Sequence, residues 1–235
     1  MRKLLIVLCL ALAALLAGMA GAQFLPGVAK AIARVQEYEL ARSVNDAAKV
    51  AGLTAQTQID ELDAARMHAL NSEKSVVAAL PFAERGMVWS IRAAVLQQRL
   101  DVKSVADMSH GPFFEAFLAA NAKQASVAAP LFMPLAALPA GGDKTWVWVG
   151  PPGYSPWLTL LPSIFNGLRV AVVPEAGELK VDMTLLLQKS AAENARYVAA
   201  PDGSVNPQMM KVLTGYTGDA EDLWTPLAAV SGQSG

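Results

Sequence analysis

Residues 168–181 read LRVAVVPEAGELKV. A run rich in valine and alanine, from Leu168 to Val173, leads into Pro174-Glu175-Ala176-Gly177, and a shorter alternating run, Leu179 to Val181, follows. Branched side chains favour extended backbone, whereas proline and glycine favour turns. This stretch therefore predicts a β-hairpin with a four-residue turn, and with it an antiparallel sheet.

The sequence just before the hairpin is also typical of sheet rather than of long helices. Between Pro130 and Pro174 it is rich in proline and glycine, which interrupt helices. Short strands are predicted over Thr145 to Val149 and over Leu158 to Leu161, and helices longer than two turns are not expected there.

The first half of the chain has the periodicity of helices. From Gln23 to about Val50, apolar residues recur at spacings of three and four, and this pattern predicts an amphipathic helix that Gly52 ends. Further helices are predicted over residues 57–68, 73–80, 84–100 and 112–123. For Met87 to Val95 a strand is the alternative, because branched and aromatic side chains are frequent in that run.

The sequence after the hairpin predicts short elements. A helix is expected over residues 182–193 with Asp182 as its cap, and one more strand over residues 196–199. From Pro201 onward the chain is rich in turn-forming residues, and Trp224 is the large apolar side chain expected to anchor it.

Together these elements predict an α+β fold with a long N-terminal apolar and amphipathic helix, a helical middle region and a small antiparallel sheet near the C-terminus. Composition suggests a helical region over residues 23–125 and a sheet-containing C-terminal region over residues 126–235. We expect the helix over residues 23–50 to lay its apolar face against the sheet, because each needs a partner to bury that face.

The first 22 residues indicate export. Arg2 and Lys3 precede an uncharged stretch, Leu4 to Ala22, which ends in the small residues Ala20-Gly21-Ala22. This pattern is typical of a signal peptide with its cleavage site. A retained membrane anchor is the alternative, because 19 residues at about 1.5 Å each span roughly 28 Å of bilayer. Both readings predict an exported bacterial protein that is anchored in the inner membrane, periplasmic or on the cell surface.

Composition excludes several classes of protein. The 19 basic and 20 acidic residues give a net charge of -1, and hydrophobic residues make up 54%. This excludes wholesale disorder and argues against a nucleic-acid-binding module, which needs a basic face. The single cysteine, Cys9, lies inside the apolar stretch, so neither disulfides nor thiolate metal sites are expected in the exported part.

The sequence predicts no catalytic residue, cofactor or metal site. His68 and His110 are far apart in the chain, and neither has a second ligand at a suitable spacing. Ser155 is followed by proline and tryptophan, which breaks the nucleophile-elbow pattern. The carboxylates considered as a hydrolytic pair are Asp107, Glu115, Glu175 and Glu178. Because their positions in the chain are ordinary for solvated acids, an exported hydrolase has the least support.

One cluster of aromatic residues is a candidate contact surface. It consists of Trp146, Trp148, Tyr154 and Trp157. Trp146 and Trp148 would lie on one face of a strand, where they could bind a sugar or a peptide. The alternative is that they form a stripe in the core. Because few cations lie nearby, an oligonucleotide platform is not expected.

The N-terminal layout resembles that of type IV pilins. An apolar segment from Leu4 to Ala22 passes through Pro26 into the amphipathic run Val28 to Gln36, as in a pilin helix that leaves the membrane as a stalk. The sequence departs from the pilin pattern at Lys3-Leu4 and at Leu8, where pilins carry a processing glycine and a glutamate.

The C-terminal half is similar to minor pilins of conjugative-plasmid thin pili. The similarity rests on a hydrophobic strand, a short helix, a tyrosine-containing loop and a Trp-Thr-Pro-Leu segment, namely Leu168 to Val173, Met183 to Ala192, Tyr197 to Pro201 and Asp222 to Leu227. These resemblances imply a structural protein that acts in pilus assembly or adhesion and meets other pilus or envelope subunits through its N-terminal helix. The alternative is a soluble periplasmic binding or assembly factor, released after signal cleavage, with the aromatic cluster as its contact face.

Overall fold

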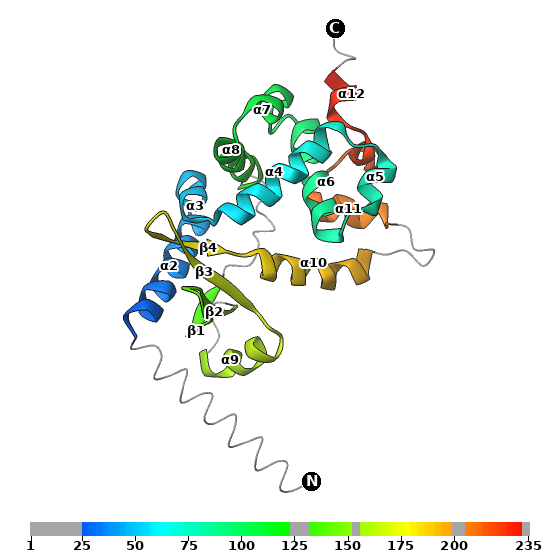
Figure 1. The fold of residues 1–235 in the computed structure, drawn as a ribbon. Helices are drawn as coiled ribbons and strands as arrows, with labels where there is room; N and C mark the ends of the chain where they lie inside the picture. Colours follow the sequence, from blue (N-terminus) through cyan, green and yellow to red (C-terminus); the bar gives the residue numbers. More distant parts are fainter. Residues whose placement is uncertain (1–24, 123–131, 152–155, 199–204, 232–235) are drawn as a thin grey trace, which may run out of the picture. The chain divides into compact units, whose positions relative to one another are not determined.

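The computed structural model describes residues 25–122, 132–151, 156–198 and 205–231 (Figure 1). The predicted signal or anchor over residues 1–22 lies outside them. Contacts divide the chain into two compact units, each made of two separate stretches. The sheet unit comprises residues up to Val44 together with residues 130–183, and the helical unit comprises residues 45–129 and 184–235.

The sheet unit contains four antiparallel strands in the order β1-β2-β3-β4, so a mixed helix and sheet fold is confirmed. The strands are β1 (Met133–Pro139), β2 (Thr145–Gly150), β3 (Arg169–Glu175) and β4 (Glu178–Asp182). Two helices accompany them, α2 (Pro26–Ser43) and α9 (Pro156–Phe165). Strand β2 lies where the sequence predicts it, whereas β1 was not predicted. Its two prolines fit an edge strand, which needs hydrogen bonds on one side only.

The predicted hairpin is confirmed as β3 and β4, but its turn is shorter than expected. Glu175 pairs with Glu178, which leaves Ala176 and Gly177 as the turn, with φ values of 51° and 84°. Two positive φ values suit a tight two-residue turn that follows the twist of the strands. Pro174 remains in β3 because the pairing with β2 stops at Val172, so no donor is needed on that side.

The predicted strand over residues 158–161 is wrong, as is the expectation that no helix longer than two turns occurs in this region. These residues belong to α9, which is ten residues long and contains Pro162. Pro156 opens the helix at a position where a missing N–H costs nothing. Leu160 then packs against Trp148 and Ala136 of the sheet. Packing of one helical face thus outweighs the local turn signals.

The predicted continuous helix over residues 23–50 is also wrong in its length. α2 ends at Ser43, and Asn45 takes a left-handed φ of 56°. Asp46 then caps a separate helix, α3 (Ala47–Leu53), by accepting a hydrogen bond from the backbone N–H of Lys49. Asparagine tolerates this backbone conformation, and aspartate favours the first cap of a new helix. Gly52 therefore lies within α3 rather than ending the long helix.

The inner face of α2 packs on the sheet, as the sequence predicts. The helix contacts all four strands, and Val28, Ala31 and Val35 are buried along it. Successive side chains of a strand point to opposite faces. Val147 and Val149 of β2 therefore point away from Trp148, which contacts α9. The sheet is thus covered by α2 on one face and, over β1 and β2, by α9 on the other.

The helical unit agrees with most of the predicted helices. Its elements are α3, α4 (Gln56–Asn71), α5 (Lys74–Ala79), α6 (Phe82–Leu96), α7 (Val102–Asp107), α8 (His110–Ala122), α10 (Thr184–Val198), α11 (Pro207–Thr214), the 3-10 helix η2 (Ala220–Trp224) and α12 (Leu227–Ser231). The strand alternative for Met87 to Val95 is wrong, because these residues form α6. The short helix α7 was not predicted.

Two predictions after the hairpin are corrected. Asp182 is the last residue of β4 and pairs with Ala171, so it is not the cap of the next helix. The expected strand over residues 196–199 is helical as far as Val198, and Ala199 lies outside the described residues. In the tail, Trp224 is buried against Trp89, with ring centroids 5.0 Å apart in an edge-to-face arrangement. Its predicted role as an anchor is confirmed.

A buried arginine organises the helical unit. Arg92 of α6 is 0% exposed and donates hydrogen bonds to four backbone carbonyls, those of His68, Ala69, Ser72 and Leu223. The first three lie at and directly after the C-terminal end of α4, where helix carbonyls run out of donors within the helix. The carbonyl of His68 also accepts a hydrogen bond from the backbone N–H of Ser72. Burial lowers the pKa of Arg92 to about 10, against an opposing effect of Glu73, so the side chain remains charged at neutral pH.

We expect Arg92→Met to destabilise the protein by about 3 to 5 kcal/mol, because it leaves buried carbonyls without donors. Arg196→Gln, an exposed change on α10, is the matched control and should cost less than about 0.5 kcal/mol. Urea unfolding followed by circular dichroism measures both. Equal midpoints for the two variants would show that Arg92 does not hold the unit together.

Candidate functional site

The predicted aromatic contact residues have different environments. Trp148 is 9% exposed and packs with Ala136 and Leu160, whereas Trp146 is half-buried at the edge of the same cluster. Tyr154 lies outside the described residues, and Trp157 is placed by its backbone in the first turn of α9. Trp148 thus belongs to the core of the sheet unit, and Trp146 is the aromatic side chain of β2 that solvent can reach.

Two cations flank Trp146. The Lys144 ammonium lies 5.2 Å and the Arg169 guanidinium 4.3 Å from the centroid of the Trp146 ring. Arg169 stands opposite Trp148 in the register of β2 and β3, on the same face of the sheet. Cations at these distances are attracted by the ring face. This half-exposed group of one aromatic and two basic side chains can therefore present positive charge beside an apolar surface.

The histidines lie in different surroundings. His68 is near the end of α4, and its Nδ1 lies 2.9 Å from the Ser72 hydroxyl oxygen. His110 opens α8 with its Nε2 3.2 Å from a carboxylate oxygen of Asp63 and its Nδ1 3.6 Å from Asp60. The sequence did not predict these carboxylate neighbours, because they come from another helix. Within the described part of the chain, no group of three or more potential ligands could hold a metal ion.

The four carboxylates considered as candidates for a hydrolytic pair do not line a common hydrolytic site in either unit. In the sheet unit, Glu175 and Glu178 face each other across the hairpin turn. Glu178 lies 2.8 Å from Lys180, whose hydrogen bond and charge lower the pKa of Glu178. In the helical unit, Asp107 ends α7, and Glu115 is exposed on α8. These are the surroundings of ordinary solvated acids.

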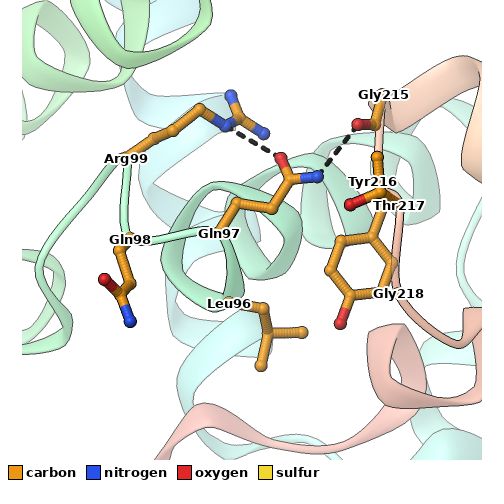
Figure 2. Close-up of a pocket in the computed structure, with 8 residues that line it drawn as sticks. All are labelled: Leu96, Gln97, Gln98, Arg99, Gly215, Tyr216, Thr217 and Gly218. Carbon is orange, nitrogen blue, oxygen red and sulfur yellow. Dashed lines mark hydrogen bonds between the residues drawn. The ribbon is translucent and has the colours of Figure 1, made fainter.

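The helical unit carries an open depression of about 530 Å³ where two helices end. Figure 2 shows the residues after α6 on one side and the loop after α11 on the other. Gln97 joins the two sides by donating a hydrogen bond from its Nε2 to the carbonyl of Gly215. The lining residues are Leu96, Gln97, Gln98, Arg99, Gly215, Tyr216, Thr217 and Gly218.

Both sides of this depression are built from helix C-termini. Gly215 has a φ of 63° and ends α11, and Gln98 has a φ of 57° just after α6. Arg99 turns back to donate hydrogen bonds to the Gln97 side chain and to the carbonyl of Ala120, and burial lowers its pKa. The sequence did not reveal this site, because Gln97 and Gly215, which join its two sides, are 118 positions apart in the chain. The glycines before and after Tyr216, Gly215 and Gly218, did indicate a turn there.

Tyr216 forms one wall of the depression. Its hydroxyl donates a hydrogen bond of 2.8 Å to Asp222. Burial first, then this hydrogen bond and the charge of Asp222, raise the pKa of Tyr216 to about 12. The close approach of the ring leaves no room at Gly218, where an added Cβ would clash with the Tyr216 hydroxyl group. Tyr216 thus keeps its proton at neutral pH and links the loop after α11 to η2.

The outer face of α2 is a further surface of the sheet unit. Its exposed residues Ala29, Ala33, Gln36 and Leu40, together with Val44 directly after the helix, follow one another at spacings of four, three, four and four. We call these five residues the outer stripe. Leu40 is 63% and Val44 is 65% exposed. Residues at such spacings share one side of a helix, so this side of α2 is uncharged along the whole stripe.

We expect Tyr216→Phe to lower the free energy of unfolding by about 1 kcal/mol at neutral pH, through loss of the bond to Asp222. In the unfolded chain tyrosine ionises near pH 10, and in the folded protein near 12. Stability due to the protonated Tyr216 is therefore fully present below pH 10 and is lost as the pH rises to 12.

The stability curves of the protein and of Tyr216→Phe should thus converge between pH 10 and 12, as measured by urea unfolding. Asp222→Asn keeps the acceptor but removes the charge. It should reduce the pH dependence without abolishing it, because burial is the larger cause of the shift. Parallel curves across this interval would rule out the assigned role of Tyr216.

No helix within the described ranges is long and apolar enough to cross a membrane. The chain matches no known family model, and comparisons with curated proteins and with solved structures found no significant match.

Proposed function

We propose that this chain is an exported structural protein, similar to a type IV minor pilin or a pilus accessory subunit, that acts in assembly or adhesion. In this proposal the apolar segment, Leu4 to Ala22, continues through Pro26 into α2 as one long N-terminal helix. The segment anchors the chain in the inner membrane, and the sheet unit is carried on the exported side. The partners are other pilus or envelope subunits.

The outer stripe of α2 is the observation that supports this proposal best. A helix that packs on a sheet by one face usually carries charged side chains on the other. Here the stripe residues are small, apolar or neutral, and the charged residues Lys30, Arg34 and Glu37 lie beside the stripe, the last two 3.2 Å from each other. Exposed apolar side chains at spacings of three and four are typical of helices that pack against a neighbouring helix.

Contacts on the inner side of α2 hold the helix, and with it the outer stripe, in a fixed orientation. Glu39 is buried, and its Oε2 accepts a 2.9 Å hydrogen bond from the backbone N–H of Phe132, directly before β1. Its Oε1 lies 2.8 Å from Arg42. A buried carboxylate with two partners fixes the helix in its rotation about its own axis. The outer stripe would therefore be presented to a partner without any rearrangement.

The apolar segment before α2 would make association easier. Anchors that insert into one membrane confine their exported parts near one another, which raises the effective concentration of the stripes. Full burial of a leucine or valine side chain contributes about 1.5 to 3 kcal/mol. A contact centred on Leu40 and Val44 can thus be weak between free molecules and still form between anchored ones.

The soluble alternative has one supporting observation. Trp146 is half-exposed between Lys144 and Arg169, as a contact residue of a periplasmic binding or assembly factor would be. The two hypotheses differ in the fate of residues 1–22. The proposal for an anchored subunit therefore depends on the N-terminus of the mature chain.

We expect the chain isolated from cells to retain its apolar segment and to fractionate with membranes. Intact-mass spectrometry of the native protein measures this directly. A mature chain that begins at Gln23 and is found in the soluble periplasm would contradict the anchored proposal and favour the soluble factor.

We expect the double change Ala33→Glu and Leu40→Glu to weaken association of the full chain in detergent or in vesicles by at least about thirtyfold. The reason is that about 2 kcal/mol of apolar burial is lost and charge enters the contact. Both positions are exposed, so folding should be unaffected. Sedimentation or chemical crosslinking measures the association.

The matched control introduces the same charges in the helical unit, at the exposed positions Met67 of α4 and Ala119 of α8. Met67→Glu with Ala119→Glu should leave association unchanged. If both double variants associate equally well, the outer stripe is not the contact.

A further inference from the structure

One end of the α9 face of the sheet combines positive charge, an aromatic ring and an uncharged helix. Lys144 and Arg169 flank the half-buried Trp146, and Trp146 borders the cluster that Leu160 of α9 forms with the sheet. The strand register places Arg169 on this same face. The group therefore lies directly beside α9.

The two cations have no acidic partner among the described residues. Their contact is with the Trp146 ring, and neither forms an ion pair with a described carboxylate. The acids on the same face of the sheet lie on the hairpin of β3 and β4, namely Glu175, Glu178 and Asp182. Glu178 is engaged by Lys180. Lys144 and Arg169 are thus not engaged in ion pairs at the α9 end of this face, although the exposed Asp143 directly precedes Lys144.

α9 adds apolar character to the same place. Its ten residues, PWLTLLPSIF, include no charged side chain. Leu160 and Ser163 are buried toward the sheet, whereas Pro162 is exposed. Because the whole helix is free of charged residues, its outward side, to which the exposed Pro162 belongs, carries no charge either. A charge-free helix side facing away from the core is unusual for a helix in water.

We propose that this part of the sheet unit docks on the surface of an anionic phospholipid bilayer. We call it the α9 patch: Lys144, Trp146, Arg169 and the side of α9 that carries Pro162. Tryptophan favours the level of the lipid headgroups, basic side chains pair with lipid phosphates, and an apolar helix side enters the boundary of the acyl chains.

The charge and the hydropathy of the α9 patch both favour an anionic bilayer as its partner. An anionic bilayer offers phosphates and hydrocarbon within a few ångströms of each other, which matches two unpaired cations beside an uncharged helix. A soluble anion such as phosphate would neutralise the cations but would leave the α9 side in water. The docking uses residues of the sheet unit alone and does not depend on subunit assembly.

The test uses the full chain reconstituted into vesicles of phosphatidylcholine, with and without phosphatidylglycerol. Brominated acyl chains quench tryptophans that reach the interface, and subtracting the signal of Trp146→Phe isolates Trp146 from the other tryptophans. We expect Trp146 to be quenched in the anionic vesicles and much less in the neutral ones. Added salt should reduce the quenching, because it screens the attraction.

Removing the two cations should undock the patch. Each basic side chain near an anionic surface favours the docked state. Lys144→Gln with Arg169→Gln should therefore lower the ratio of docked to undocked protein by about thirtyfold. The control Lys103→Gln with Arg196→Gln removes the same charges from exposed positions of the helical unit and should change nothing. Arg169→Lys keeps the charge and should dock, which separates loss of charge from misfolding.

Several results would overturn the proposal. They are equal quenching in neutral and anionic vesicles, equal loss in the control variant, and displacement by inorganic phosphate at an ionic strength where chloride has no effect. The last would mean that the cations bind a soluble anion. The variant Ala33→Glu with Leu40→Glu should still dock, so failure of docking and failure of subunit association are distinguishable.

Discussion

The buried guanidinium of Arg92 is the interaction on which the helical unit depends. One side chain supplies donors to the end of α4 and to Leu223 of η2, segments more than a hundred residues apart in the chain. A buried charge is costly to desolvate unless all of its donors are used. The cost is offset here because the carbonyls of Ala69 and Ser72, at the end of α4, need a donor at this place. The helices can therefore close around α6 only in an arrangement that brings these carbonyls to Arg92.

Glu39 has the complementary role in the sheet unit. It is a buried acceptor, and it receives the backbone N–H of Phe132 just before β1. This contact, with the valines of the inner face, sets which side of α2 meets the strands. The rotation of α2 in turn decides which residues remain outside. The uncharged outer stripe is thus a consequence of how the inner face is fixed, and it stands as a surface that the unit itself does not use.

The sequence predicted elements whose signals are local. The hairpin, strand β2 and the helices of the middle region follow from side-chain periodicity. The errors occurred where packing overrides local preference. α9 contains prolines and was expected to be a strand, but its contact with Trp148 stabilises the helix. The long N-terminal helix was expected to be continuous, but Asn45 and Asp46 end one helix and cap another.

The candidate sites were less predictable than the fold for the same reason. The pairing of Trp146 with Arg169 depends on the register of β2 and β3, which no periodicity reveals. Of the aromatic cluster, alternation correctly put Trp146 and Trp148 on one face, but it could not show that Leu160 covers one of them. The low charge between residues 126 and 174 has two physical sources in the described structure. One is the part of the sheet formed by β1 and β2, which α2 and α9 cover on opposite faces, and the other is α9 itself, which contains no charged residue.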